Sequence, residues 1–323
     1  MSNNNEYISC NIIEHGFDAQ FDSINLCCRI SKDNDERHVL ISNYKGKKID
    51  WSDFFKKTNE LRNIQKSGGT IPSCAGCIYL EKRDWGNERY INTININNWI
   101  KCNANCIYCN RSEFNGIKEY NIYPIIKDLV EKNLLRNPAD ITIAGGEPTI
   151  TRDFDKTLKI LIKHNISPVR VLTNAIKYSK YIEKGLYLGL VNILVSTDSG
   201  TAETYRKIKT VNKHKDVWKN IKKYAEKQKT DSLVKTKYIL IPGINDNQEE
   251  LFEFVNRNKE ACIKYACIDV EISWLLKNTD NIEEMKRLYD LYLRTKEYGK
   301  KAGIDISAFD RMSIVEKKIK DKQ

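Results

Sequence analysis

Strand and helix signals alternate after residue 85, and this alternation constrains the fold more than any other feature of the sequence. Six apolar runs are predicted to be strands, at 90–97, 140–144, 168–172, 191–195, 235–241 and 267–273. Helices are predicted between them, at 123–135, 154–164, 176–188, 217–229 and 249–258. The first of these shows the helical period, because Ile125, Ile126, Leu129 and Val130 share one face. A long helix at 282–302 and a strand at 305–308 complete the pattern.

Strands that alternate with helices form a parallel α/β structure with right-handed crossovers. The runs ILVS and YILI are continuously apolar, as expected of strands that are buried on both faces. Six such units, rather than eight, predict a partial (β/α)6 barrel of the TIM type. In barrels of this type the chemistry gathers at the carboxyl ends of the strands.

Residues 1–85 lack this alternation and predict a small, Cys-rich α+β domain. The barrel domain is predicted at 86–323 and includes the last helix and strand as a C-terminal extension. In the first domain, strands are predicted at 20–29 and 38–43 and a helix at 51–65. The stretch SGGTIPSCAGC then forms a loop punctuated by Gly and Pro. A domain with so few core-forming residues would fold poorly alone, and a bound metal would stabilise it.

Composition indicates a globular protein of the cytoplasm. The chain has 323 residues, of which 41% are hydrophobic. No run approaches the ~18 apolar residues of a membrane span, and the polar N-terminus lacks a signal-peptide core. The net charge of +11 lies beyond residue 85, where 42 basic residues accompany 31 acidic ones. Because no block of like charges interleaves with aromatic residues, this excess argues for solvated helix faces and against nucleic acid as a partner.

Ten cysteines need an explanation other than disulfides, because the cytoplasm keeps thiols reduced. Eight of them fall in the first third of the chain, and clustered thiolates in a reduced compartment indicate metal binding. Cys262 and Cys267 stand apart in a hydrophobic stretch and are expected to be buried structural residues.

Three thiols follow the first predicted barrel strand in the segment CNANCIYC, as Cys102, Cys106 and Cys109. Three thiolates on one loop can bind three irons of a cubane cluster and leave the fourth iron open, which is typical of a reactive site. A zinc site or unligated thiols are the alternatives.

The second predicted strand ends in Gly145, Gly146, Glu147 and Pro148. Two glycines allow the backbone to approach a ligand closely, and the carboxylate can pair with an ammonium group. A simple strand-to-helix turn is the alternative. The segment lies about one βα unit after the cysteines and at the carboxyl end of its strand, which favours the functional interpretation.

The two motifs, CxxxCx-aromatic-C and GGEP, together resemble the radical S-adenosylmethionine (SAM) superfamily over about residues 90–275. The resemblance implies that Cys102, Cys106 and Cys109 ligate a 4Fe–4S cluster whose fourth iron is chelated by SAM. It also implies that Tyr108 lies near the adenine and that the segment 145–148 holds the methionine amine. An electron from a flavodoxin- or ferredoxin-type donor would then cleave SAM into methionine and a 5′-deoxyadenosyl radical.

Further cofactor residues follow from the same resemblance. The segment LVSTDSG resembles the fourth-strand motif that binds ribose hydroxyls, with Ser196 as the first candidate and Asp198 as the second. A helix N-cap is the alternative for both. Lys209 stands where many relatives place an arginine against the SAM carboxylate, and a surface lysine is the alternative.

Other strand ends supply weaker candidates. Thr173 and Asn174 end the third strand and could face SAM, whereas the segment 239–246 is assigned only a general role beside the adenine. Glu271 and Trp274, in the sixth strand, are candidates for the mouth of the substrate site.

The N-terminal thiols form a second constellation, Cys10, Cys28, Cys74 and Cys77, with Cys27 as the rival to Cys28. Only one of the two adjacent residues can point inward from a strand. The arrangement resembles a twitch domain, the half-length relative of the SPASM domain, and implies a fully ligated auxiliary 4Fe–4S cluster. A four-thiolate zinc site is the alternative.

The resemblance implies hydrogen abstraction from a substrate that the sequence does not identify. A net oxidation of a sugar, an aminocyclitol or a related small molecule is preferred, and modification of a ribosomally made peptide is the alternative. From a different class, the chain could be a non-catalytic zinc or iron–sulfur protein that binds nucleic acid.

Overall fold

The computed structural model describes residues 6–27, 39–77, 79–109, 119–278 and 280–322. The chain divides into two compact units. The first comprises Met1–Lys101 and Phe114–Arg170, and the second comprises Cys102–Glu113 and Val171–Gln323. The cysteine loop therefore belongs to the second unit, whereas the GGEP segment belongs to the first.

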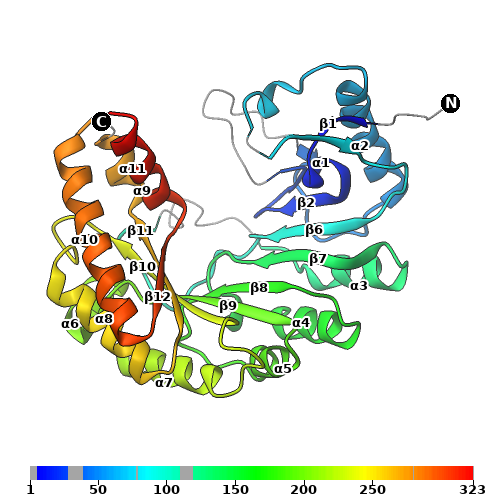
Figure 1. The fold of residues 1–323 in the computed structure, drawn as a ribbon. Coiled ribbons are helices and arrows are strands. Elements are labelled where there is room, and N and C mark those ends of the chain that lie inside the picture. Colours follow the sequence, from blue (N-terminus) through cyan, green and yellow to red (C-terminus); the bar gives the residue numbers. More distant parts are fainter. Residues whose placement is uncertain (1–5, 28–38, 78, 110–118, 279, 323) are drawn as a thin grey trace. The chain divides into compact units, whose positions relative to one another are not determined.

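The first unit is built on strands in the order β4-β3-β2-β6-β7 (Figure 1). Strands β2, β6 and β7 run parallel, and β3 and β4 are antiparallel to their neighbours. A separate antiparallel ribbon pairs β1 with β5. The elements are β1 Glu6–Ser9, α1 Asn11–His15, β2 Gly16–Ala19, β3 Ile24–Asn25, β4 Val39–Ile41, α2 Trp51–Lys66, η1 Pro72–Cys74, β5 Glu81–Asp84, β6 Ile91–Ile96, α3 Tyr123–Glu131, β7 Leu135–Ile143, η3 Pro148–Ile150 and α4 Phe154–Lys163.

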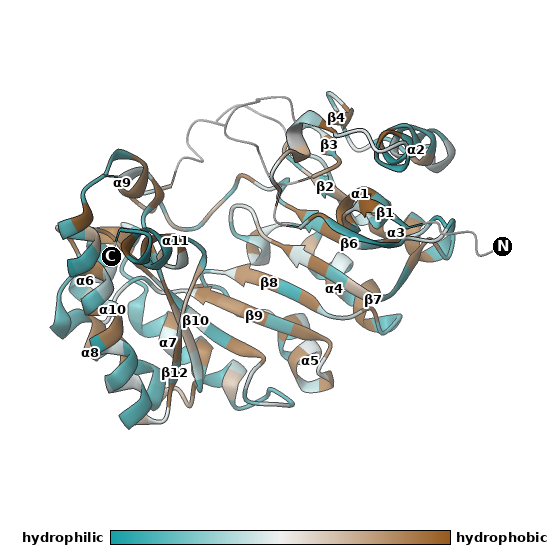
Figure 2. Ribbon diagram, turned by 45° about the horizontal axis from the view of Figure 1, so that its top comes forward, coloured by the Kyte–Doolittle hydropathy of each residue, from teal (hydrophilic) through white to brown (hydrophobic). Residues whose placement is uncertain are grey.

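The second unit carries strands in the order β8-β9-β10-β11-β12, with β9 to β12 parallel. Its elements are β8 Val169–Thr173, which begins within the first unit, α5 Lys180–Leu188, β9 Val191–Ser196, α6 Ala202–Lys209, α7 His214–Ala225, β10 Val234–Leu240, α8 Gln248–Glu260, β11 Tyr265–Val270, α9 Ile272–Lys277, α10 Ile282–Ala302, β12 Asp305–Ala308 and α11 Asp310–Lys320. Hydrophobic residues gather on β9, and hydrophilic residues follow α8 and α10 (Figure 2). This distribution is expected where helices cover strands that are buried on both faces.

The predicted α/β class with parallel strands is confirmed, and the long helix and last strand have the predicted bounds. Capping residues explain where other predictions were wrong. The helix predicted at 176–188 is α5, which starts at Lys180 because the Ser179 side chain caps it. The strand predicted to reach 273 ends at Val270, because Glu271 caps α9 instead.

Several elements were not predicted, among them α6 and β2. Helix α6 begins after Thr201, whose side chain accepts a hydrogen bond from the backbone of Thr204. In the N-terminal region, the strand predicted at 20–29 is reduced to Ile24–Asn25, and residues from 28 onward fall outside the described part. The four residues Gly16–Ala19 instead pair in parallel with β6. A strand this short and without alternation leaves little trace in a sequence.

Candidate functional site

The cysteine loop lies against the carboxyl end of helix α6, within the second unit. The backbone nitrogen of Asn105 donates to the carbonyl oxygen of Lys209 over 3.2 Å, and that of Ile107 donates to Ile208 over 3.0 Å. The Thr210 hydroxyl returns a 3.0 Å hydrogen bond to the carbonyl oxygen of Asn105. The end of a helix leaves carbonyl groups without intrahelical partners, and here the loop supplies donors to two of them.

The three loop thiols are accessible to different extents. Cys102 and Cys109 are exposed, whereas Cys106 is partly buried. The side-chain amide of Asn174 donates to the Cys102 sulfur over 3.7 Å and to the Asn103 side chain over 2.7 Å. Burial raises the pKa of Cys106, while the Lys209 ammonium opposes this increase. A nearby cation and an amide donor both favour the thiolate, which is the form that binds iron.

Within the described ranges, no three His, Cys, Asp or Glu side chains converge on a point that would hold a single metal ion. A cubane cluster gives each thiolate its own iron, so its ligands stand further apart than those of one zinc ion. The donor set fits a cluster with three protein ligands.

A buried network of polar side chains, Tyr108, Asp198 and Lys209, connects this loop to the rest of the second unit. The Tyr108 hydroxyl donates to a carboxylate oxygen of Asp198 over 2.6 Å, and the Lys209 ammonium forms an ion pair with the same oxygen. The ammonium also lies 2.9 Å from the Tyr108 oxygen. The second Asp198 oxygen accepts from the backbone nitrogen of Ile239 over 2.9 Å, and the Asn245 amide donates to the Asp198 carbonyl oxygen over 2.9 Å. Five elements of the second unit therefore meet at Asp198.

The interpretation of Lys209 as a surface lysine is wrong, because only 1% of the residue is exposed. Burial lowers its pKa, but the Asp198 carboxylate and the Cys106 thiol outweigh this effect, so the pKa is raised and the ammonium keeps its charge. Burial, with the Asp198 charge added, raises the pKa of Tyr108 well above its usual value, so the phenol keeps its proton. The network therefore holds one positive charge against one negative charge, with a neutral hydroxyl between them.

The GGEP segment makes its contacts within the first unit. Gly145 adopts φ +111°, and a Cβ on Gly146 would lie 2.1 Å from the Lys101 carbonyl oxygen. The backbone nitrogens of Gly146 and Glu147 donate to the carbonyl oxygens of Trp99 and Lys101 over 2.7 and 2.8 Å. The close approach that these glycines allow is thus to the chain that leads into the cysteine loop. The buried Glu147 carboxylate accepts from the Thr149 hydroxyl over 2.6 Å and caps η3, which begins at Pro148.

The other predicted site residues lie at the ends of their strands. Thr173 is the last residue of β8 and Asn174 follows it, and their side chains accept hydrogen bonds of 3.0 Å from the backbone of Ala175 and Ile176. Ser196 is the last residue of β9 and is half-buried. All three therefore lie at the carboxyl ends of their strands, where the chemistry of α/β barrels gathers.

Two weaker candidates belong to helix α9 rather than to a strand. The Glu271 carboxylate accepts from the backbone nitrogens of Ser273 and Trp274 over 2.9 and 2.7 Å. The prediction that both side chains extend from the sixth strand is therefore wrong.

The N-terminal thiols that the structure describes share one neighbourhood in the first unit. Cys10 is buried just before α1, Cys74 ends η1, and the Cys77 nitrogen donates to the Cys74 carbonyl over 3.0 Å. Burial raises the pKa of Cys10 to about 11, and the thiols of Cys27 and Cys74 add to the increase. Cys28, the preferred fourth ligand, lies outside the described residues.

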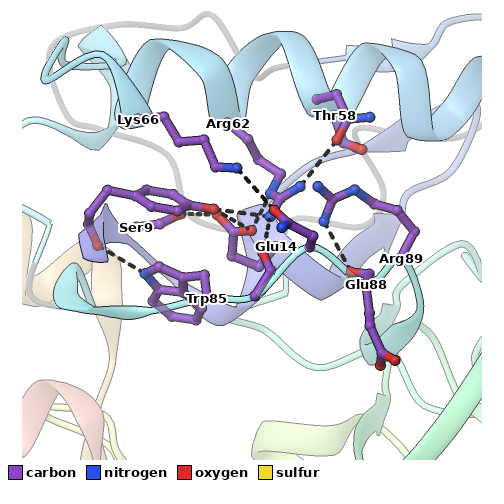
Figure 3. Close-up of polar contacts among 12 residues, drawn as sticks. Ser9, Glu14, Thr58, Arg62, Lys66, Trp85, Glu88 and Arg89 are labelled. Carbon is purple, nitrogen blue, oxygen red and sulfur yellow. Dashed lines mark hydrogen bonds and ion pairs between the residues drawn. The ribbon is translucent and has the colours of Figure 1, made fainter. Parts of the chain in front are cut away.

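A buried charge pair fixes the backbone around Cys10 (Figure 3). The Glu14 carboxylate binds the Arg62 guanidinium of α2 in an ion pair whose side chains are 0% and 1% exposed. It also accepts hydrogen bonds from Ser9 over 2.6 Å and from Tyr7 over 3.0 Å. Because the Glu14 nitrogen donates to the Cys10 carbonyl oxygen over 3.1 Å, the pair holds the thiol's backbone in place.

One residue of interest was missed by sequence reasoning. Lys237 lies in the middle of β10 and is only 9% exposed. Its position directly before the apolar run 238–240 of the same strand was the available signal.

The match to a known family spans the segment that carries the three loop thiols. The sequence model of the Radical SAM superfamily matches residues 99–255. GTP 3′,8-cyclase of Clostridium botulinum strain Hall is 30% identical over 186 residues, which cover 56% of this chain and 57% of that protein. The probable GTP 3′,8-cyclase of Archaeoglobus fulgidus is 31% identical over 170 residues, or 52% and 56% of the two chains. The chain thus spans a little over half the length of these curated relatives.

Solved structures show the same fold. Streptococcus suis SuiB, in its complex with the precursor peptide SuiA, superposes with a TM-score of 0.53 at 15% identity, over 88% of this chain and 58% of that one. The structure described as native anSMEcpe with bound AdoMet gives a TM-score of 0.50 at 16% identity, over 66% and 63%. Residues 99–255 thus match the radical SAM superfamily, and the fold of the chain is the partial α/β barrel seen in these structures. No helix in the described part has the length and apolar character needed to cross a membrane.

Proposed function

We propose that this chain binds SAM at a 4Fe–4S cluster on Cys102, Cys106 and Cys109 and abstracts hydrogen from a small-molecule substrate. The observation that carries the proposal is the attachment of the three-thiol loop to the Tyr108–Asp198–Lys209 network. A ligand loop that is held by a buried charge pair keeps a fixed geometry, as a reactive metal site requires.

Different residues of the second unit would bind the cluster and SAM. The three thiolates would hold the cluster, and Asn174 would orient Cys102 by donating to its sulfur. Ser196 and Thr173 would contact SAM from their strand ends, whereas Lys209 and Asp198 would act through Tyr108 and the loop. When cluster and SAM are bound, they would supply a 5′-deoxyadenosyl radical, and the protein would exclude water and orient the substrate's C–H bond.

A small molecule is proposed as the substrate because the curated relatives are named for reactions of GTP, which is itself a small molecule. Net oxidation of a sugar, an aminocyclitol or a similar compound is one form of this chemistry. Modification of a ribosomally made peptide is the alternative. The electron would come from a flavodoxin- or ferredoxin-type donor.

The thiols of residues 1–85 would hold a second, fully ligated cluster. The position of Cys10 supports this proposal, because the thiols of Cys27 and Cys74 both raise its pKa and must therefore lie near it. A closed cluster offers no open iron, so its role would be to pass an electron or to shape the substrate site.

Anaerobic reconstitution tests the proposal. The loaded protein is expected to contain about eight irons per chain and to release 5′-deoxyadenosine when it is reduced in the presence of SAM. Replacement of Cys102 by Ala should remove about four irons and all SAM cleavage. Replacement of Cys262, which is exposed and not buried as the sequence predicted, should change neither. Colourless protein that contains zinc, or iron-loaded protein that leaves SAM intact, would contradict the proposal.

A further inference from the structure

Lys237 projects from the middle of β10 toward the face of the sheet that helix α8 does not cover. Tyr238, the next residue, points the other way and packs on Phe254 of α8, with ring centroids 5.1 Å apart. Because side chains alternate along a strand, Lys237 and Ile239 share the opposite face. Ile239 packs there in the cluster that contacts Tyr108 of the cysteine loop. Lys237 thus lies on the same face of the sheet as Ile239, the residue next to the candidate site, and two residues before it in β10.

The neighbours of Lys237 come from three elements. Its register partners are Ser196 on β9 and Cys267 on β11. Its ammonium lies 5.4 Å from the centre of the Phe309 ring, in the segment that joins β12 to α11. An aromatic face attracts a cation but does not neutralise it.

The acidic groups on this side of the unit already have partners. Asp198 is paired with Lys209, and Asp269 binds the Arg311 guanidinium, with 3.1 Å between Asp269 Oδ2 and Arg311 Nε. The two Glu271 oxygens accept from the backbone of α9. Among the residues that the structure describes, none forms a hydrogen bond or an ion pair with the Lys237 ammonium.

The stem of Lys237 is buried, with 9% of the residue exposed, whereas its unpaired ammonium is not fully enclosed, so a ligand can reach it. Buried lysines are otherwise paired. A bound anion would supply the missing charge, and Ser196, whose side chain is half-buried beside Lys237, adds a hydroxyl that can donate to the same group.

We propose that Lys237 binds an anionic group of the substrate, a phosphate or a carboxylate, on the inner face of the strands of the second unit. The word "substrate" rests on the proposed function, whereas the binding of an anion at Lys237 does not. The strand β10 provides a matched control: Lys235 lies on the same face, is exposed, and stands 5.5 Å from the Tyr265 ring in the same kind of contact.

The test is thermal unfolding of cluster-loaded, oxidised protein with and without inorganic pyrophosphate, and separately with succinate. Both wild type and Lys235→Met should be stabilised by one of these anions, and the preferred anion distinguishes phosphate from carboxylate. Lys237→Met should weaken binding of that anion roughly 10- to 100-fold, as expected for the loss of one charge-assisted contact. Without anion, Lys237→Met should unfold at the wild-type temperature or above it, because methionine keeps the packing of the buried stem and breaks no hydrogen bond or ion pair of the ammonium with any described residue.

Three results would overturn the proposal. One is equal stabilisation of wild type and Lys237→Met by each anion, which indicates a general salt effect. Another is unfolding of Lys237→Met well below wild type without anion, which indicates a structural lysine. The third is weaker SAM binding by Lys237→Met, which would assign the anion to SAM.

A measurement on the wild type covers the case in which Lys237→Met does not fold. Acetylation by acetic anhydride, read residue by residue by mass spectrometry, should be slowed by the anion at Lys237 and unchanged at Lys235; equal protection at both would contradict the proposal. If wild-type protein fails to cleave SAM, the proposed function is wrong, yet anion protection at Lys237 would still stand.

Discussion

Lys209 and Asp198 form an ion pair across 11 residues of sequence, with side chains that are 2% and 0% exposed. Their partners are Tyr108 of the cysteine loop and the backbone of β10. The pair therefore joins the metal-ligand loop to the sheet, and its loss should affect both stability and cluster binding.

Replacing Asp198 by Asn should destabilise the protein by about 3–5 kcal/mol, because it leaves a buried ammonium without its counter-ion. Lys209→Met should have a similar cost, and the double variant should cost less than the sum of the two. Denaturant unfolding measures the stability, and iron content should fall by about four per chain. The exposed pair Lys213–Asp216 serves as the control, since Lys213→Met should change neither quantity. Additive single-variant effects would contradict the coupling.

The fourth ligand of the proposed auxiliary cluster can be assigned by single substitutions. Cys27 influences the pKa of Cys10, which makes Cys27 a candidate ligand, whereas Cys28 lies outside the described residues. If Cys27 is the ligand, Cys27→Ala should lower the iron content of reconstituted protein by about four per chain, and Cys28→Ala should leave it unchanged. Iron lost from the Cys28 variant alone would reverse the assignment. Either variant should retain the electron paramagnetic resonance signal of the cluster at Cys102.

Gly146 allows the GGEP segment to pack on the chain before the cysteines. Gly146→Ala would place a Cβ 2.1 Å from the Lys101 carbonyl oxygen, so the backbone must move. We expect a loss of several kcal/mol in unfolding free energy, about that of severe overpacking. Gly243→Ala is the matched control, because Gly243 has φ +82° but open space around its Cα. That variant should cost only about 1 kcal/mol, from backbone strain. Equal losses would contradict the expectation that the close approach to Lys101 limits the side chain at position 146.

His214 should make the stability of the protein depend on pH. Burial, with the nearby Arg257 charge, lowers its pKa below the ordinary 6.5. The neutral ring accepts a 3.0 Å hydrogen bond from the Trp218 indole. Since the unfolded chain binds the proton more readily, this contribution is complete above about pH 6.5 and is lost as the pH falls toward the folded pKa.

Unfolding midpoints at about pH 7.5 and about pH 5.5 check this expectation. His214→Gln should reduce the loss of stability on acidification, by up to about 1.4 kcal/mol per pH unit. The exposed His164→Gln is the control and should keep the wild-type slope. An unchanged slope in His214→Gln would exclude this residue as the source.

The sequence alone determined the α/β class, the three-thiol loop and the order of most elements. Those features depend on local signals: continuous apolar runs, helical periodicity and the spacing of cysteines on one loop. The strand-end positions of Thr173, Asn174 and Ser196 followed from the same signals, because the carboxyl ends of parallel strands meet at one edge.

Only the tertiary structure decided what the polar residues contact. Asp198 could have been a ribose ligand or a helix cap, but it receives Tyr108 from 90 residues earlier and Ile239 from 41 residues later. Contacts between distant segments also decide three other features. They decide which segment Gly145 and Gly146 approach, that Lys209 is buried, and that the Lys237 ammonium has no hydrogen-bond or ion-pair partner among the described residues. The sequence around a charged or hydroxyl side chain does not show which distant segment will fold against it, so these contacts could not be predicted from the sequence.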